Sequence, residues 1–158
     1  SGTAGGRTPL RAPVQALLRV MQRLYAARGL ELEMADFADG LEFRGEEQDL
    51  QEMVGNLLDN ACKWAARRVR IGARASAPDR LQIVIDDDGP GIAEDERERI
   101  FERGVRMDEQ RPGSGLGLDI VRDLAGTYGG EVSAGQAPLG GLRVTLTLPA
   151  LPTGAGAR

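Results

Sequence analysis

The chain has 158 residues, a formal net charge of −4 and 41% hydrophobic residues, which is the length and composition of about one globular domain. No arginine-rich stretch with interleaved aromatics favours a nucleic-acid surface, and no apolar run reaches the roughly 18 to 20 residues of a membrane span. The sequence has no histidine and one cysteine, Cys62, which excludes an internal disulfide and favours a reducing, cytoplasmic compartment. A histidine general base, metal ligand or phosphoacceptor would have to come from another polypeptide.

Both ends of the chain are rich in glycine and other small residues. We predict flexible tails at residues 1–6 and 153–158, the first being a tail or a cloning remnant. Between them we expect a helical segment at 7–28 and a single domain at 29–152. Apolar residues recur at helical spacing from Pro13 to Arg28, and Gly29 supplies a stop.

The rest of the chain alternates between strand and helix patterns. Apolar and polar residues alternate at 30–36 and 40–45, on either side of an Asp-Gly pair, which predicts two short strands. Helices are expected at 47–66, 94–104 and 117–130. Further strands are predicted at 68–75, 80–89, 131–135 and 142–149. Two helices packed on one face of a mixed, mostly antiparallel sheet give an α+β fold, a two-layer sandwich.

The helix expected at 47–66 presents its polar residues on one side. At about 100° per residue, Glu52, Asp59, Asn60 and Lys63 lie within roughly 60° of Asn56, and the apolar residues face the opposite way. A solvated surface would give such a strip too, but asparagine is a poor helix former. Carboxamide oxygens are suitable Mg²⁺ ligands, and Lys63, the only lysine in the sequence, supplies a point charge for phosphate.

Two glycine clusters lie further along the chain. In "DDDGPGI", Asp86 to Ile92, the glycines allow a sharp turn and Asp87 could accept a hydrogen bond from an exocyclic amine; a plain strand-to-helix turn is the alternative. "RPGSGLGL", Arg111 to Leu118, does not follow a strand, which argues against a Rossmann loop, and the missing lysine excludes a Walker A loop. It leads into a helix whose N-terminal amides could meet phosphates. Arg106 and Arg111 could add charge-assisted contacts or remain surface residues.

These features together resemble the GHKL ATPase family, and within it the ATP-binding catalytic domain of sensor histidine kinases, especially the PhoQ-like type. Four boxes occur in the family's order: an N box in "NLLDNACKW", a G1 box in "DDDGPGI", an F box in "IFERG" and a G2 box in "GSGLGL". A late Gly-Gly-x-x-x-T follows in "GGLRVT". The resemblance covers roughly residues 30–149. It implies the Bergerat fold, ATP and Mg²⁺ as ligands, and transfer of the γ-phosphoryl group to a histidine.

The resemblance also implies roles for individual residues. Asn56 and Asn60 would hold Mg²⁺, and Asn60, Lys63 and Arg111 would form the catalytic set. Asp87 would read the adenine, the segment from Arg106 to Leu118 would form the ATP lid and its hinge, and a threonine of the last strand would lie beneath the base. The complete ATP-binding set implied in this way is Asn56, Asn60, Lys63, Trp64, Asp87, Gly89, Gly91, Ile92, Arg106, Arg111, Gly113, Ser114, Gly115, Leu116, Gly117, Leu118 and Thr145.

The sequence departs from the family's pattern in two places. Ser114 stands where some PhoQ-like members carry a glutamine that can reach the metal. The phosphoacceptor histidine and its helical dimerisation domain are missing, and the 7–28 segment would lead from them. The resemblance implies a membrane-anchored homodimeric sensor kinase of the inner membrane with a response regulator downstream. The present portion would be its monomeric, cytoplasmic catalytic domain, and we expect no nucleic-acid partner.

Two other functions remain open at this point. An anti-sigma-type serine kinase also works without a histidine, and a nucleotide-sensing or pseudokinase module would use the same pocket only for binding. A gyrase-like or chaperone-like ATPase would need a carboxylate at the position of Asn56 as general base for water. The asparagine therefore favours transfer over hydrolysis.

Overall fold

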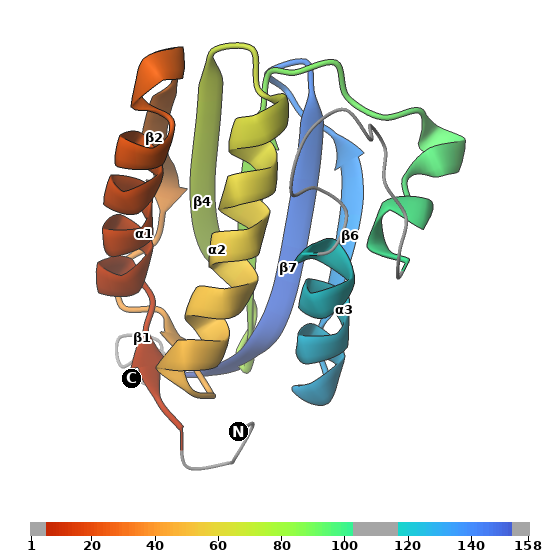
Figure 1. Ribbon diagram of the computed structural model, residues 1–158. Coiled ribbons are helices and arrows are strands. Elements are labelled where there is room, and N and C mark those ends of the chain that lie inside the picture. Colours follow the sequence, from red (N-terminus) through yellow and green to blue (C-terminus); the bar gives the residue numbers. More distant parts are fainter. Residues whose placement is uncertain (1–5, 103–116, 153–158) are drawn as a thin grey trace.

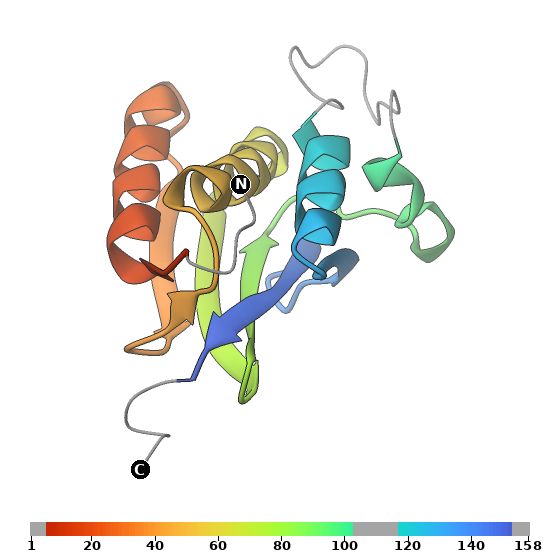
Figure 2. The ribbon, with the colours of Figure 1, turned by 90° about the horizontal axis from the view of Figure 1, so that it is seen from below.

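The computed structural model describes residues 6–102 and 117–152. These residues form a two-layer sandwich, in which the helices cover one face of a twisted sheet (Figures 1 and 2). The helices are α1 (Arg11–Leu24), α2 (Glu47–Trp64) and α3 (Gly117–Thr127). The strands are β1 (Thr8–Pro9), β2 (Glu31–Phe37), β3 (Glu42–Phe43), β4 (Arg68–Ala77), β5 (Arg80–Asp87), β6 (Glu131–Gln136) and β7 (Leu142–Leu151). Short 3₁₀ turns occupy Ala26–Arg28, Glu94–Glu96 and Arg99–Phe101.

The sheet is mixed and mostly antiparallel, as the sequence predicts. Its strand order is β1-β3-β7-β5-β4-β2, and β6 also pairs with β7. The ladders that join β4, β5 and β7 are antiparallel, whereas β2 runs parallel to β4. Because successive side chains on a strand point to opposite faces, each central strand sends one set toward the helices and the other to an open face.

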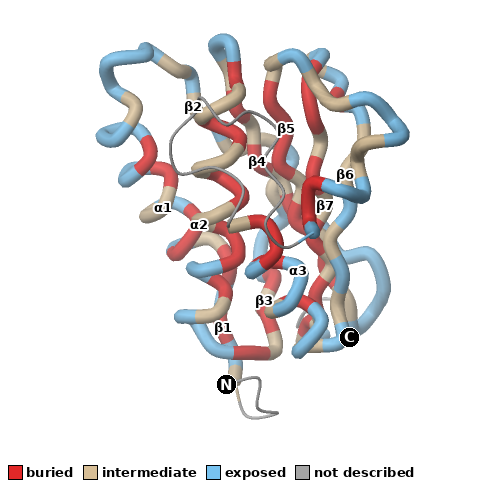
Figure 3. The backbone as a smooth tube through the Cα atoms, turned by 45° about the vertical axis from the view of Figure 1, so that its right-hand side comes forward, coloured by how far each residue is buried: buried red, intermediate tan, exposed pale blue. Residues whose placement is uncertain are grey.

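The hydrophobic core lies between the sheet and the helices. Leu81, Ile83 and Ile85 of β5 are at most 1% exposed, and Figure 3 shows buried backbone along the central strands and within α2. The helix α2 contributes Leu50, Met53, Val54, Leu57, Leu58, Ala61 and Cys62. The predicted apolar side of this helix is therefore confirmed. Burial raises the pKa of the Cys62 thiol to about 12, which makes it a core residue rather than a nucleophile.

The N-terminal helix belongs to the same core. Val14, Leu18 and Met21 of α1 are buried and join the residues of α2 in one cluster. The predicted helix is α-helical only to Leu24, and a 3₁₀ turn continues it to Arg28. None of the helices in the described residues is long and apolar enough to cross a membrane.

The two strands predicted on either side of the Asp-Gly pair form, and one predicted helix does not. The strand β2 pairs with β4 and β3 pairs with β7, toward opposite ends of the sheet. Alternation of apolar and polar residues indicates which face a strand buries, and not which strand lies beside it. Of the helix expected at 94–104, the described residues 94–102 contain two 3₁₀ turns instead, of which the second is anchored on the core by Ile100 and Phe101.

Candidate functional site

A pocket of about 240 Å³ opens where β5 ends, beside the C-terminus of α2. Its lining consists of Trp64, Asp87, Pro90, Gly91, Ile92, Ala93, Glu96 and Leu142. Most of these side chains are apolar, and two are carboxylates. Such a pocket suits a flat, mostly apolar ring that carries a few polar groups at its edge.

Asp87 is the buried polar residue of this pocket, with 2% of its surface exposed. Its Oδ1 accepts hydrogen bonds from the backbone N–H groups of Gly89 at 2.9 Å and Leu142 at 3.2 Å. Among the described residues no donor reaches Oδ2, so this oxygen is left for a ligand. Burial raises the pKa of the carboxyl above its usual range, although the two backbone donors oppose the shift. A ligand donor would therefore stabilise a carboxylate that the fold leaves incompletely compensated.

Glycines allow the backbone to close around this carboxylate. A β-carbon at Gly141 would lie 2.2 Å from Oδ1 of Asp87, and one at Gly89 would lie 2.3 Å from the carbonyl oxygen of Trp64. Gly91 has a φ of 74°, which other residues rarely adopt. The pocket thus depends on the absence of side chains at Gly89 and Gly141.

The polar side of α2 continues from the pocket toward the start of α3. Asn56, Asn60, Lys63 and Trp64 are all partly exposed. The side-chain amide of Asn56 donates to the carbonyl of Glu52 at 2.8 Å. Its Oδ1 faces Gly117, because a β-carbon added there would lie 2.7 Å from that oxygen. The end of the second glycine cluster therefore packs against the first asparagine of the helix.

Lys63 is held by a chain of contacts that begins on α1. Its Nζ lies 3.2 Å from Oδ2 of Asp59, and the hydroxyl of Tyr25 donates to Oδ1 of Asp59 at 2.7 Å. Burial, and then the bond to Asp59, raises the pKa of Tyr25, so this hydroxyl remains a donor at neutral pH. Arg28 donates to the carbonyls of Cys62, at 2.9 Å, and Ala65 at the end of α2. The segment that follows α1 thus fixes the helix end next to Trp64.

The third aspartate of the cluster fixes the geometry of the strand end. Oδ1 of Asp88 accepts backbone N–H groups from Ala66 and Arg67, both at 2.9 Å, and from Arg68 at 3.0 Å. Burial alone would raise the pKa of Asp88, but these hydrogen bonds outweigh it and the pKa is lowered. Asp88 therefore ties the turn after α2 to the end of β5, which holds two walls of the pocket together.

The part of the sequence that forms this site matches a known protein family. Residues 45–152 match the family described as "Histidine kinase-, DNA gyrase B-, and HSP90-like ATPase". The chain belongs to this ATPase family. The matched range contains α2, the pocket and β7, and α1 lies before it although it shares the core.

The relatives narrow the family to sensor histidine kinases. Sensor protein kinase CarS of Pseudomonas aeruginosa is 50% identical over 119 residues, which are 75% of this chain and 26% of that protein. Sensor protein PhoQ of Escherichia coli is 40% identical over 136 residues, 86% of this chain and 28% of that protein. The chain thus spans about a quarter of these relatives. The solved structure of the mycobacterial sensor histidine kinase MprB has a TM-score of 0.82 at 30% identity and covers 94% of this chain and 99% of that chain. The predicted fold class and the PhoQ-like resemblance are confirmed.

In this ATPase domain the structure brings together many of the predicted site residues. Trp64, Asp87, Gly91 and Ile92 line the pocket, and Gly89 forms the turn beside it. Gly117 and Leu118 begin α3. The other residues assigned to the lid lie outside the described residues: Arg106, Arg111, Gly113, Ser114, Gly115 and Leu116.

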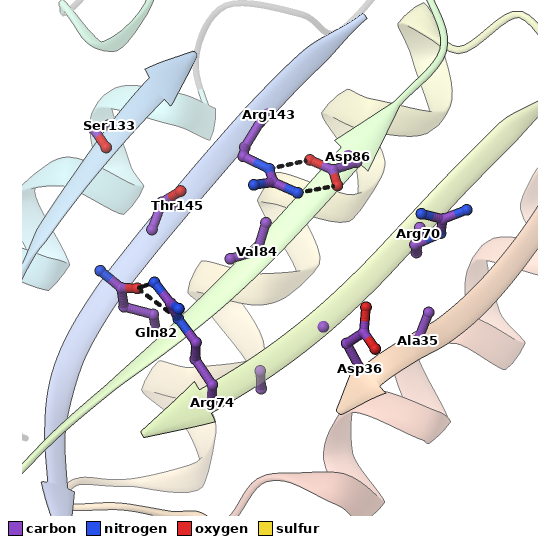
Figure 4. A pocket seen from close by; sticks show the side chains of 12 residues that line it. Ala35, Asp36, Arg70, Arg74, Gln82, Val84, Asp86, Ser133, Arg143 and Thr145 are labelled. Atoms are coloured by element: carbon purple, nitrogen blue, oxygen red, sulfur yellow. Dashed lines mark hydrogen bonds and ion pairs between the residues drawn. The ribbon is translucent and has the colours of Figure 1, made fainter. Parts of the chain in front are cut away.

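Thr145 lies on the other face of the sheet from this pocket. Its neighbours Val144 and Leu146 point into the helix-covered core, so Thr145 points to the open face. There it lines a separate cavity with Asp86 and Arg143 (Figure 4). The alternation of β7 thus directs Thr145 away from the pocket beside Asp87, so Thr145 would not lie beneath a base bound in that pocket.

The predicted set lacks four residues that line the pocket, Pro90, Ala93, Glu96 and Leu142, and also the neighbouring Gly141. Leu142 both lines the pocket and donates its backbone N–H to Asp87, and Gly141 lets β7 approach that carboxylate. The available signal was the Gly-Gly pair of "GGLRVT". Its role could be assigned only once the start of β7 was known to lie beside the end of β5.

Amide oxygens are the candidate protein ligands for a metal near the pocket. The described residues contain no group of three or more His, Cys, Asp and Glu side chains that could hold a metal ion by themselves. Mg²⁺ commonly keeps several waters and takes only one or two protein ligands together with substrate phosphates. Oδ1 of Asn56, which faces the start of α3, is an amide oxygen suited to this mode of binding.

Proposed function

We propose that this domain binds Mg·ATP between α2, the β5 end and α3, and donates the γ-phosphoryl group to a histidine on a separate helical domain of the same full-length protein. The observation that carries the proposal is the buried Asp87, whose Oδ2 receives no donor from the described residues, in a pocket of about 240 Å³. The exocyclic amine of adenine would supply that donor. The apolar walls, including Ile92, would contact the two faces of the ring.

The phosphates would then follow the polar side of α2. Asn60 and Asn56 would present oxygen ligands, and Lys63 would contact phosphate while Asp59 and Tyr25 hold it in place. The bound Mg²⁺ would neutralise part of the phosphate charge and orient the transferred group. Arg111 and the lid segment, which lie outside the described residues, would complete the catalytic set.

The acceptor has to come from elsewhere because the sequence contains no histidine. We therefore infer a histidine-bearing dimerisation domain that precedes α1 in the full-length protein, with a response regulator as the downstream partner. The full-length protein would be a membrane-anchored homodimer, and this domain would lie on the cytoplasmic side of the inner membrane. Phosphoryl transfer relies on positioning and charge neutralisation, so a site without its own nucleophile is chemically adequate.

Titration of a fluorescent ATP analogue tests the adenine assignment. Asp87→Asn should weaken binding by roughly tenfold to a hundredfold, as expected for loss of a hydrogen bond to a charged group. Asn60→Ala should weaken binding with Mg²⁺ more than binding without it. Equal affinities of wild type and Asp87→Asn would refute the assignment.

Transfer requires a second measurement with the helical domain present. The full-length protein should incorporate labelled γ-phosphate in an acid-labile form, because phosphohistidine is hydrolysed in acid and phosphoserine is not. Acid-stable label would favour a serine kinase. Nucleotide binding without any label would favour a sensing module.

A further inference from the structure

The open face of the sheet contains a second cavity, of about 500 Å³. It lies on the side away from the helices and is bounded by residues of five strands (Figure 4). Its lining consists of Ala35, Asp36, Arg70, Gly72, Ala73, Arg74, Gln82, Val84, Asp86, Ser133, Arg143 and Thr145. Three arginines in one cavity are notable in a chain of net charge −4.

The register of the strands explains the shape of this cavity. One row across β4, β5, β7 and β6 holds Gly72, Val84, Thr145 and Ser133. The row on one side holds Arg70, Asp86 and Arg143, and the row on the other side holds Arg74 and Gln82. Short side chains therefore lie between two walls of long polar ones. With strands about 4.8 Å apart, a floor that crosses four strands is on the order of 14 Å long.

Two of the arginines are held in fixed positions. Nε and Nη2 of Arg143 donate to the two oxygens of Asp86, each at 2.8 Å, and the Asp86 side chain is only 4% exposed. Nε and Nη2 of Arg74 donate to Oε1 of Gln82 at 3.2 and 2.9 Å. In each guanidinium, Nη1 has no recorded partner among residues 6–102 and 117–152. Because both groups are already ordered, a ligand would not have to immobilise them.

The charge of the lining favours an anion at one end. Three guanidinium groups and two carboxylates, Asp36 and Asp86, line the cavity, and Arg70 is in addition paired with Glu33 at 3.1 Å. Asp86 is satisfied by Arg143, and the recorded partner of Arg74 is the neutral Gln82. Asp36 follows a register shift between Met34 and Phe37 and has a φ of 56°. It stands at the β2 edge of the cavity. Arg74, whose side-chain partner among the described residues is neutral, is therefore the guanidinium whose charge is left for an anionic group.

We propose that this cavity binds a small organic anion that lies along the floor between the two walls, with its carboxylate or phosphate group at Arg74 and its remaining polar groups toward Arg143. Both groups present oxygens in a geometry that a guanidinium recognises. Hydroxyl groups of the ligand would meet Thr145 and Ser133. The volume is in the range of sites for small molecules. Because this face of the sheet is opposite the nucleotide pocket, the anion and ATP could be bound at the same time.

Titrations monitored by backbone amide resonances test this proposal. Citrate and glucose 6-phosphate are added separately to the ¹⁵N-labelled domain at constant ionic strength. We expect saturable shifts in the millimolar range, confined to the amides of residues 70–74, 82–86 and 143–145. The ligand that saturates at lower concentration distinguishes a carboxylate site from a phosphate site. Shifts that do not saturate, or that spread over the surface, would overturn the proposal.

Matched variants separate the cavity from general charge effects. Arg74→Gln should weaken the tighter ligand about tenfold, the size expected for loss of a charge-assisted hydrogen bond. Arg19→Gln, at an exposed position of α1, removes the same charge and should leave the affinity unchanged. Asp87→Asn should also leave it unchanged, so failure of the nucleotide assignment and failure of this proposal are distinguishable. An equal effect of Arg19→Gln and Arg74→Gln would contradict the site.

Discussion

Asp86 and Asp87 are neighbours on β5 and are about equally buried, at 3% and 2% exposure, yet they face opposite sides of the sheet. On the open face, both oxygens of Asp86 are matched by the guanidinium of Arg143. On the helix-covered face, the donors to Asp87 within residues 6–102 and 117–152 are two backbone N–H groups, and both of these use one oxygen. The negative charge of Asp86 is therefore balanced by Arg143, whereas the buried charge of Asp87 is met by hydrogen bonds to one oxygen.

This difference shows where the molecule can gain free energy from a ligand. A buried carboxylate with a bidentate partner has little to gain from another donor, whereas one with a vacant oxygen and a raised pKa gains from any donor that reaches it. The pocket beside Asp87 is therefore the place where function is expected. Asp86 serves instead to position Arg143.

Gly141→Ala is the change with the largest expected effect on the Asp87 side. The added β-carbon would lie 2.2 Å from Oδ1 of Asp87 and 2.6 Å from the backbone nitrogen of Gly89, neither of which can move easily. We expect the free energy of unfolding to fall by about 2 to 3 kcal/mol in urea denaturation. Gly126→Ala is the control, because nothing lies within 4 Å of its added carbon, and on a helix it should stabilise by up to about 1 kcal/mol. Equal midpoints for the two variants would contradict the close approach of β7.

Asp86→Asn tests the other side of the comparison. It removes the charge that holds Arg143, and we expect a loss of about 1.5 to 2 kcal/mol in unfolding free energy, limited by the 40% exposure of the Arg143 side chain. Nucleotide affinity should stay within about twofold of wild type, since the side chain points away from the pocket. The double variant with Arg143→Gln should lose less than the sum of the single variants. A loss of nucleotide binding as large as that of Asp87→Asn would remove the distinction between the two faces.

The sequence predicted the Asp87 side better than the Asp86 side. Local periodicity was sufficient to place Asn56, Asn60 and Lys63 on the polar side of α2, because a helix fixes these relations over a few turns. The glycine clusters indicated where backbone would approach a ligand. The short helix at 94–104 was wrong because buried anchors on the core, rather than propensity, decide that segment.

Long-range pairing was the part that local patterns could not supply. The hydrogen bonds that Asp88 accepts from Ala66, Arg67 and Arg68 join residues 20 to 22 positions apart. The strands β2 and β3 likewise pair with strands that are distant in sequence. Thr145 is a different case. The alternation of "LRVTLTLP" places it opposite to Val144 and Leu146, whereas the family motif places it beneath the base.

Nucleotide affinity should depend on pH through Asp87. Its pKa is raised in the folded domain, first of all by burial, so acidification protonates it at a higher pH than an exposed aspartate. The protonated carboxyl cannot accept from the adenine amine at the same oxygen, and affinity should fall as the pH falls through the raised pKa. By linkage, the same shift makes the folded state bind protons more tightly, so this group's contribution to stability decreases as the pH rises through that range.

Comparison with Asp87→Asn distinguishes protonation of the Asp87 carboxyl from protonation of the nucleotide itself. Adenine also binds a proton in acid, and the variant retains only that dependence. We therefore expect the wild-type affinity to decline at a higher pH than the affinity of the variant, measured with the same fluorescent analogue. Parallel profiles would show that the carboxyl of Asp87 does not titrate in the binding reaction.

Tyr25→Phe tests the support of Lys63, the residue proposed to contact phosphate. Among the variants considered it has the smallest expected effect on binding. The variant removes the hydroxyl that holds Asp59, so the carboxylate that pairs with the ammonium of Lys63 is less firmly fixed. ATP affinity should fall about two- to threefold, the effect of a hydrogen bond worth roughly 0.5 kcal/mol, while adenosine affinity should not change. Tyr128→Phe is a matched control, since its hydroxyl donates to Asp49 near the other end of the same helix. If both variants lower ATP and adenosine binding alike, the hydroxyl of Tyr25 supports the helix as a whole and does not position the lysine.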